Sequence, residues 1–212
     1  MTTTTTSEPT LAVEDLHVRR GGHEVIVGLS HAWGPGVHGI TGPNGAGKST
    51  LLRAVAGVIP YRGTVRIAGH DLGASPHLAK RHVGAMLDAA DPMPYLTPRE
   101  VLETFAAVRG HADAGLGEFA SLVTEAALDL ETSTLSTGQR RKLQLALALQ
   151  GEPPLVLLDE PANALDLDSQ EMLRSRVDSL REARRCVLVA SHRLDSLDVP
   201  LDSTLEIRPA GA

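Results

Sequence analysis

A glycine-rich stretch from Gly42 to Thr50 carries residue types that bind phosphate. It fits the pattern G-x-x-x-x-G-K-[ST] at every position, and its glycines let successive backbone N–H groups point at phosphate oxygens. Lys48 adds a point charge for the β- and γ-phosphates, and the Ser49 hydroxyl is a hard oxygen ligand for Mg²⁺. The predicted nucleotide-binding residues of this stretch are Asn44, Gly45, Ala46, Gly47, Lys48, Ser49 and Thr50.

Two carboxylates follow an apolar run of strand length, Leu155 to Leu158. Such a run is typical of a buried parallel strand, and ligands of parallel sheets bind at the carboxyl ends of the strands. We therefore assign Asp159 to Mg²⁺ and Glu160 to the attacking water, which it would orient or deprotonate. The alternative is a solvated acidic turn ahead of Pro161.

Two further polar residues stand at the ends of predicted elements. Ser136 precedes the apolar helical run Leu143 to Leu149 and is placed as an N-cap, where unpaired N–H groups and the helix dipole can bind an anion. Ordinary capping of a buried helix explains this serine equally well. His192 follows the strand-like run Val187 to Ala190, where a ring nitrogen could reach the γ-phosphate or the water. An ordinary surface histidine is the alternative there.

The phosphate-binding stretch needs a strand before it and a helix after it. The residues Val37 to Thr41 and Leu51 to Gly57 supply these two elements. Upstream, short β-like runs between residues 11 and 39 are separated by glycines and predict a sheet that contains a hairpin. The alternating residues Gly63 to Gly69 predict one more strand, which we expect to pair with this N-terminal sheet.

Residues 88 to 150 are predicted to form a helical insertion. A proline-broken loop, Asp88 to Leu96, leads into the capping box Thr97-Pro98-Arg99-Glu100 and a helix that ends at Gly110. A second helix is predicted from about Gly117 to Leu128. The apolar stripe predicted to face the core from the first helix consists of Val101, Leu102, Phe105 and Val108.

Length and composition favour a single globular domain, which we place at residues 11–212 of the 212-residue chain, with 42% hydrophobic residues. A formal net charge of −6 without a long basic run argues against a nucleic-acid partner. The single cysteine, Cys186, fits a reducing compartment. Residues 1–10 are threonine-rich, and we expect a disordered tail rather than a signal peptide. No apolar run approaches the roughly 20 residues of a membrane span.

The order of these features, from about Leu11 to Ile207, resembles the nucleotide-binding subunit of ATP-binding cassette (ABC) transporters, most of all the short ATPases of exporters. The resemblance implies an α/β fold: a P-loop NTPase core of parallel strands flanked by helices, an N-terminal antiparallel β subdomain and an inserted helical subdomain at about 88–150. The motifs that carry it are Gly42 to Thr50 (Walker A), Leu135 to Gln139 (signature), Leu155 to Glu160 (Walker B), Asn163 to Asp166 (D-loop) and His192 (switch histidine).

In this family two subunits face each other head to tail, so the resemblance implies that each ATP lies between the Walker A loop of one subunit and the signature of the other. It also implies Mg²⁺-dependent ATP hydrolysis, with Glu160 and His192 catalytic and Asp166 in the D-loop. A separate transmembrane permease subunit and a cytoplasmic location, peripheral on the membrane face, follow in the same way. Homodimer or heterodimer, and import or export, stay open. The signature residues expected to act on the partner's ATP are Ser136, Thr137, Gly138 and Gln139.

Three positions depart from the family pattern. Thr137 replaces a glycine and crowds a surface meant to approach phosphate. Asp88 replaces a glutamine, and we assign it to Mg²⁺ beside Ser49 and Asp159. Arg20 replaces an aromatic residue, so its planar guanidinium is predicted to stack on the nucleotide base.

Other functions share part of the pattern. A soluble ABC ATPase that serves iron–sulfur assembly, translation or DNA repair as an ATP-gated clamp would carry every one of these motifs. A P-loop kinase or GTPase would leave Ser136 and His192 unexplained. Transport requires a docking surface for the permease, and the apolar loop residues Met93, Tyr95 and Leu96 are candidates, unless they pack within the helical subdomain.

Overall fold

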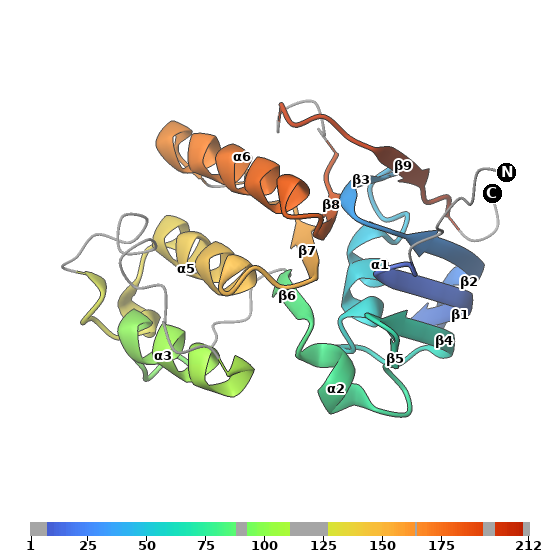
Figure 1. Ribbon diagram of the computed structural model, residues 1–212, viewed down its shortest axis with the longest axis horizontal. Coiled ribbons are helices and arrows are strands. Elements are labelled where there is room, and N and C mark those ends of the chain that lie inside the picture. Colours follow the sequence, from blue (N-terminus) through green and yellow to red (C-terminus); the bar gives the residue numbers. More distant parts are fainter. Residues whose placement is uncertain (1–7, 88–92, 111–126, 164, 193–197, 210–212) are drawn as a thin grey trace, which may run out of the picture.

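The computed structural model describes residues 8–87, 93–110, 127–163, 165–192 and 198–209, and the described strands form two sheets (Figure 1). The parallel sheet has the order β6-β7-β8-β3-β9 and consists of Val83–Met86 (β6), Leu155–Asp159 (β7), Cys186–Ala190 (β8), Gly36–Thr41 (β3) and Ser203–Glu206 (β9). The antiparallel sheet has the order β2-β1-β4-β5 and consists of Leu11–Arg20 (β1), His23–Trp33 (β2), Arg62–Ile67 (β4) and His70–Asp71 (β5). The predicted fold class is confirmed, and so is the pairing of β4 with the N-terminal strands.

The central strands β7 and β8 are buried along their whole length. Because side chains alternate along a strand, Leu155 and Leu157 pack into the core shared with α1 and the antiparallel sheet. Val156 and Leu158 pack into the other core, beneath α3, α5 and α6. The parallel sheet therefore separates two hydrophobic cores, which is why its central strands are continuously apolar in sequence.

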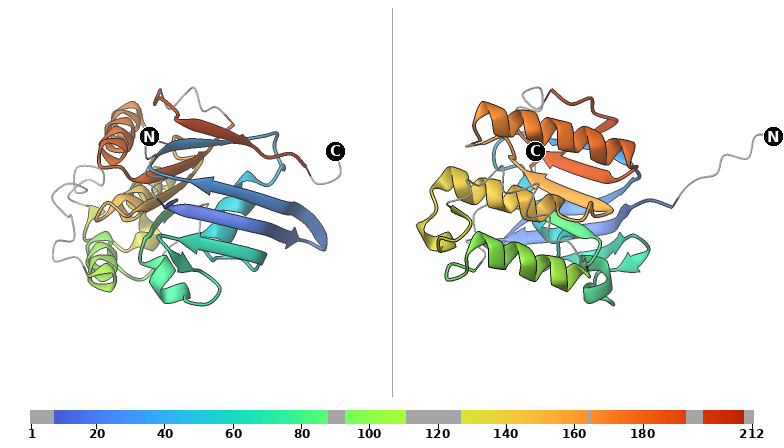
Figure 2. Two further views of the ribbon diagram at one scale, coloured as in Figure 1. Left: turned by 45° about the vertical axis from the view of Figure 1, so that its right-hand side comes forward. Right: turned by 60° about the vertical axis from the view of Figure 1, so that its left-hand side comes forward.

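The helices cover this sheet on both faces (Figure 2). The described helices are α1 (Lys48–Val55), α2 (Pro76–Lys80), α3 (Pro98–Arg109), the 3₁₀ turn η2 (Thr132–Thr134), α5 (Thr137–Leu149) and α6 (Leu167–Glu182). Helices α3, α5 and α6 lie on one side of the sheet, and α1 lies on the other (Figure 2). In the part of the chain that the structure describes, no helix is both long enough and apolar enough to cross a bilayer.

Helix α3 begins as predicted, with a capping box between Thr97 and Glu100. The predicted apolar stripe is wrong at Val108, which is 69% exposed, while Ala106 is buried. Val108 is exposed because it lies near the end of α3, where the helix borders an open groove beside α2 and β6. The second predicted helix, from about 117 to 128, falls largely outside the described residues.

Helix α5 begins after Ser136, as predicted, and packs closely on β6. A Cβ on Gly84 of β6 would overlap the carbonyl oxygen of Ala148 and would lie 2.7 Å from Cγ of Pro153. Only glycine lets the backbone of the strand approach the helix this closely. The contact holds the last turn of α5 against the parallel sheet.

Candidate active site

The phosphate loop connects β3 to α1 by a tight backbone turn. Gly42, Gly45 and Gly47 have φ values of 141°, 81° and 110°, in a region that residues with a side chain rarely adopt. A Cβ on Gly42 would also overlap the carbonyl oxygen of Ile207. The loop therefore needs glycine for its conformation as well as for the approach of a phosphate.

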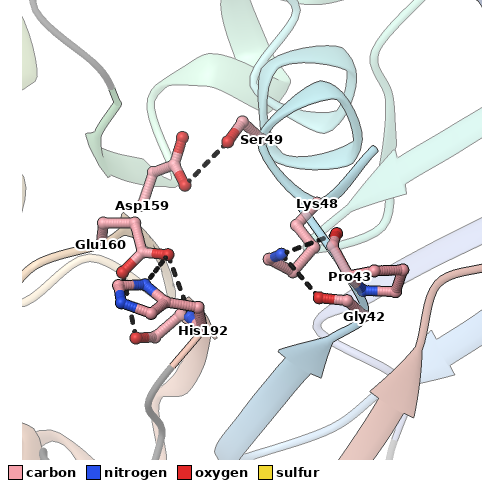
Figure 3. Close-up of polar contacts among 8 residues, drawn as sticks. Gly42, Pro43, Lys48, Ser49, Asp159, Glu160 and His192 are labelled. Atoms are coloured by element: carbon pink, nitrogen blue, oxygen red, sulfur yellow. Dashed lines mark hydrogen bonds and ion pairs between the residues drawn. The ribbon is translucent and has the colours of Figure 1, made fainter. Parts of the chain in front are cut away.

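Lys48 is the first residue of α1, and its side chain turns toward the loop (Figure 3). Its Nζ donates hydrogen bonds to the carbonyl oxygens of Gly42 (2.8 Å) and Pro43 (3.2 Å). The residue is only 8% exposed, so its charge is weakly screened by solvent. The lysine charge and the N–H groups at the start of α1 therefore meet at one loop, an arrangement that binds phosphate.

The side chains of Ser49 and Asp159 contact each other at the carboxyl end of the parallel sheet. The Ser49 hydroxyl donates a hydrogen bond of 3.0 Å to Oδ1 of Asp159, the last residue of β7 (Figure 3). Asp159 is 4% exposed. Mg²⁺ prefers oxygen ligands and is usually held by one or two protein groups together with phosphate and water, so this oxygen pair fits the ion. Asp88, the third predicted metal residue, lies outside the described residues.

Glu160 follows Asp159 in an unusual backbone conformation. Its φ of 47° is left-handed, and its N–H donates to the carbonyl oxygen of Ala190 at the end of β8 (2.8 Å). Non-glycine residues adopt this region rarely and at some conformational cost, and such residues cluster at functional sites. The backbone thus turns the Glu160 side chain toward the residues that follow β8.

Three hydrogen bonds hold the Glu160 carboxylate. Ser191 Oγ donates to Oε2 (3.1 Å). The backbone N–H of His192 (3.0 Å) and its Nδ1 (2.9 Å) both contact Oε1 (Figure 3). Partial burial raises the pKa of Glu160, but the hydrogen bonds from His192 and Ser191 outweigh it and lower that pKa below its usual value. The carboxylate is therefore ionised near neutral pH and can accept a hydrogen bond from water.

The serine-glycine segment at the start of α5 lies away from this site. Ser136 Oγ accepts from the N–H of Gln139 (3.2 Å), and Gln139 Oε1 accepts from the N–H of Ser136 (2.9 Å). Ser136 and Thr137 are exposed, and Gly138 follows them in the first helical turn. Figure 1 shows this end of α5 far from α1. An anion bound at the start of α5 would therefore be a different one from the anion held by the phosphate loop of the same chain.

Asp166 is the N-cap of α6. Its Oδ1 accepts from the N–H of Ser169 (3.0 Å), and its Oδ2 accepts from Nζ of Lys142 in α5 (2.8 Å). The hydrogen bond from Lys142 and those from Ser169 hold the pKa of Asp166 well below its usual range. Asp166 is therefore a charged group that joins two helices.

A family model described as ABC transporter matches residues 34–163, which include the phosphate loop, the start of α5 and both carboxylates. The chain belongs to the ABC transporter family. Among its ABC relatives is the Nod factor export ATP-binding protein I of Ralstonia nicotianae, 33% identical over 201 residues; the match covers 91% of this chain and 62% of that protein's length. The ABC transporter ATP-binding protein YdbJ of Bacillus subtilis, itself uncharacterized, is 32% identical over 207 residues, covering 95% of this chain and 67% of its own length.

A third relative is the daunorubicin/doxorubicin resistance ATP-binding protein DrrA of Streptomyces peucetius, 33% identical over 201 residues, with 91% of this chain and 61% of DrrA covered. The fold resembles a solved ATP-binding subunit of an ABC transporter with a TM-score of 0.85 at 25% identity, covering 94% of this chain and 86% of that one. An ABC transporter ATP-binding protein from Pyrococcus furiosus supports the fold alone, with a TM-score of 0.73 at 23% identity over 93% and 96% of the chains.

Arg20, the predicted base-stacking residue of this ABC chain, lies at the exposed end of β1, where it pairs with His23. The same hairpin reaches the phosphate loop through Val25: a Cβ on Gly47 would lie 2.8 Å from its Cγ1. The hairpin that carries Arg20 therefore touches the loop, and stacking on the base stays a prediction.

Two residues of the site were missed in the sequence. Ser191 is a buried hydroxyl that contacts Glu160, and its position at the end of β8, directly before His192, is the signal that could have identified it. Lys142 stands in the run Arg140-Arg141-Lys142, whose composition does not distinguish one basic residue from the next. Its contact with Asp166 became visible only in three dimensions.

Proposed function

We propose that the chain is the ATP-binding and ATP-hydrolysing subunit of an exporter, which drives a separate membrane-spanning partner. The observation that carries the proposal is the ionised, triply hydrogen-bonded Glu160 carboxylate next to the Ser49–Asp159 pair. A phosphate-binding loop alone would fit many nucleotide-binding proteins. A carboxylate placed to act on water distinguishes hydrolysis from binding.

Each group has a defined task in hydrolysis. Lys48 and the N–H groups of the loop bind the β- and γ-phosphates, and Ser49 and Asp159 would hold Mg²⁺, which supplies positive charge against the phosphate oxygens when bound. Glu160 accepts a hydrogen bond from the attacking water and orients it. His192 and Ser191 keep the Glu160 carboxylate ionised and fix its direction.

The remote position of Ser136 supports a site shared by two subunits. The exposed first turn of α5 presents N–H groups and the positive end of the helix dipole, and it lies away from Lys48 of its own chain (Figure 1). In a head-to-tail dimer this turn would contact the γ-phosphate of the ATP held by the other subunit. Thr137 would then narrow the space for that phosphate.

Two apolar surfaces support docking to a membrane partner, and with it a place on the cytoplasmic face of the membrane. Tyr95 is 84% exposed and Met93 is also exposed, whereas Leu96 packs against the core, so packing explains Leu96 better than docking does. A second surface is a groove of about 540 Å³ between α1, α2, β6 and α3, where Val58 and Val108 are exposed. These exposed side chains would suit an apolar helix of the partner.

The printed names of the relatives favour transport over the soluble clamp. The Ralstonia protein is named for Nod factor export and the Streptomyces protein for drug resistance, and both are ATP-binding proteins. This chain spans 62% and 61% of their lengths. Export is accordingly our proposal for this chain, and its cargo is left open.

Replacement of Glu160 by glutamine tests the proposal. The amide keeps the shape of the side chain but cannot accept the proton, so ATP binding should persist, ATP-dependent dimers should accumulate and phosphate release should fall by about 100-fold or more. Binding is measured by equilibrium titration with ATP and turnover by phosphate release. Near-normal phosphate release by this variant at saturating Mg-ATP would overturn the assignment.

Mixing two inactive variants tests the shared site. Lys48→Ala damages the phosphate loop, and Ser136→Arg damages the surface that would meet the other subunit's ATP. In a head-to-tail dimer of one variant with the other, both lesions fall in the same composite site and the second site is intact. Activity well above that of either variant alone is expected, and no recovery in dimers shown to be mixed would refute the shared site.

A further inference from the structure

The first glycine of the phosphate loop is held by the segment that follows β9. The N–H of Ile207 donates a hydrogen bond of 2.8 Å to the carbonyl oxygen of Thr41, the residue directly before the loop. The carbonyl oxygen of Ile207 lies so close to Gly42 that a Cβ on this glycine would overlap it. Strands β9 and β3 pair side by side in the parallel sheet, so these backbone contacts extend their pairing as far as the loop (Figure 1).

The last glycine of the loop is held by two apolar side chains. A Cβ built on Gly47 would lie 2.8 Å from Cγ1 of Val25 and 3.7 Å from Cγ2 of Ile207. Val25 belongs to β2, the outermost strand of the described antiparallel sheet, while Ile207 follows β9, the outermost strand of the described parallel sheet. Ile207 is 6% exposed, and Val25 packs against the same core. Val25 and Ile207 together form what we call the loop clamp.

The middle of the loop lacks this support. A Cβ built on Gly45 would meet no atom within 4 Å, so the loop is packed at its two ends and open between them. Glycine loses more conformational freedom on folding than any other residue, and Gly42, Gly45 and Gly47 all have positive φ values. The conformation of the open middle therefore depends on how firmly the two ends are held.

A groove of about 450 Å³ opens between the two segments that carry the loop clamp. It is lined by residues 25–30 of β2 and by residues 206–209, and Val27 in its wall is 54% exposed. A clamp side chain that is shortened therefore borders open space on this side, and not a packed layer that could move in to replace it. The loop would lose its support at this point.

From these contacts we infer that Ile207 is a positioning residue for the phosphate loop and that Val25 assists it from the opposite sheet. The loop clamp holds the glycines, before a nucleotide arrives, in the conformation that points their N–H groups at phosphate. This preorganisation strengthens nucleotide binding, because less conformational freedom is lost when the phosphates bind. The inference rests on the proposed ATP site, and it adds two residues, distant from each other in the sequence, that set its affinity.

Shortening of the clamp side chains tests the inference. Ile207→Ala removes Cγ2, whereas Ile207→Val keeps it and removes only the terminal methyl group. Val25→Ala removes Cγ1 on the opposite side of the loop. Ile67→Ala is the matched control, because Ile67 is fully buried in the same core but lies in β4. Each variant is titrated with Mg-ADP, which occupies the loop without being hydrolysed, and its phosphate release is measured over a range of Mg-ATP concentrations.

The inference expects weaker binding with an unchanged maximal rate. Ile207→Ala should raise the Kd for Mg-ADP and the KM for ATP by about tenfold, the result when one molecule in ten holds the loop in its binding conformation. Val25→Ala should raise both, and Ile207→Val should leave both within about twofold. At saturating Mg-ATP, kcat should stay within about twofold, because bound nucleotide orders the loop and the described contacts of Glu160 come from β8 and the residues after it.

The control separates the loop clamp from a general loss of stability. Ile67→Ala should lower the urea unfolding midpoint while its Kd for Mg-ADP stays within about twofold of the wild-type value. An equal rise of the Kd in Ile67→Ala would overturn the inference, because core stability in general would then set the affinity. A fall of kcat as large as the rise of KM would also overturn it, since the effect would then lie in the chemical step.

An unchanged Kd for Mg-ADP in the folded clamp variants would overturn the positioning role. Val25 is only partly buried, so Val25→Ala decides the question if Ile207→Ala does not fold. A wild-type protein that binds Mg-ADP but releases no phosphate from ATP would instead overturn the proposed ATPase and leave the loop clamp standing.

Discussion

Ser191 offers a sharp test of the proposed activation of water by Glu160. Replacement by alanine removes one of the three hydrogen bonds to Glu160, the 3.1 Å bond from Oγ to Oε2, and leaves the two from His192 in place. A hydrogen bond to a charged group contributes about 1.5–3 kcal/mol, and part of this is recovered when water enters. A net loss of about 1.4 kcal/mol in the transition state corresponds to a tenfold fall in kcat.

The same substitution should change the pH dependence of the reaction in a defined direction. The Ser191 hydroxyl favours the ionised carboxylate, so its removal raises the pKa of Glu160. Because the base is active when ionised, the acid limb of the kcat profile should move to higher pH. The KM for ATP should stay within about twofold, since Ser191 contacts Glu160 and not the phosphate loop.

Steady-state phosphate release between pH 5 and 9 measures all three quantities. Ser191→Thr, which keeps a hydroxyl on Cβ, is the matched control and should retain most of the activity. An alanine variant with unchanged kcat and an unchanged acid limb would refute the argument that the hydrogen bond from Ser191 helps to keep Glu160 ionised and oriented.

Three other predictions follow from local contacts. Gly84→Ala places a methyl group against the carbonyl of Ala148, so urea unfolding should show a loss of about 1–3 kcal/mol, and an unchanged midpoint would contradict the close approach of β6 and α5. Hydrogen bonds from Arg181 and Val37 lower the pKa of Asp202, so its carboxylate stabilises the fold above a pH of about 4, and this contribution is lost as the pH falls. Asp202→Asn should therefore lower the melting temperature at pH 7, and the melting temperatures of variant and wild type should converge in acid. A constant difference at all pH values would refute this role of Asp202. The predicted stacking of Arg20 would favour either purine by about 0.5–2 kcal/mol, so the Kd values for ATP and GTP should differ by less than about tenfold, and a hundredfold preference for ATP would show that another residue reads the base.

Much of the site was predictable because its residues follow simple rules of position. The phosphate loop is contiguous, so its glycines, Lys48 and Ser49 could be assigned from one stretch. Asp159, Glu160 and His192 each end a predicted parallel strand, and carboxyl ends of parallel strands meet at one sheet edge. The structure brings Ser49 to Asp159 and Glu160 to His192.

The errors and omissions have physical causes. Val108 continues the helical period of Val101, but whether a position is buried depends on what faces it, and α2 and β6 leave a groove there. The edge strand β9, Ser203–Glu206, was not predicted because its pairing with β3 depends on backbone hydrogen bonds and not on an apolar pattern. Gly84 gave no signal either, since a close approach between strand and helix depends on how distant segments pack.

The start of α5 marks the limit of what one chain can reveal about this site. Within the chain, Ser136 and Gln139 satisfy each other's polar groups, which is all that ordinary capping requires. The same exposed turn lies far from the phosphate loop of its own chain, which is the arrangement that the proposed head-to-tail dimer requires. In that dimer, the ATP of the second subunit would meet the N–H groups and the positive dipole end of this turn. The head-to-tail dimer of the proposed function is therefore the unit in which we expect the chemistry to be measurable.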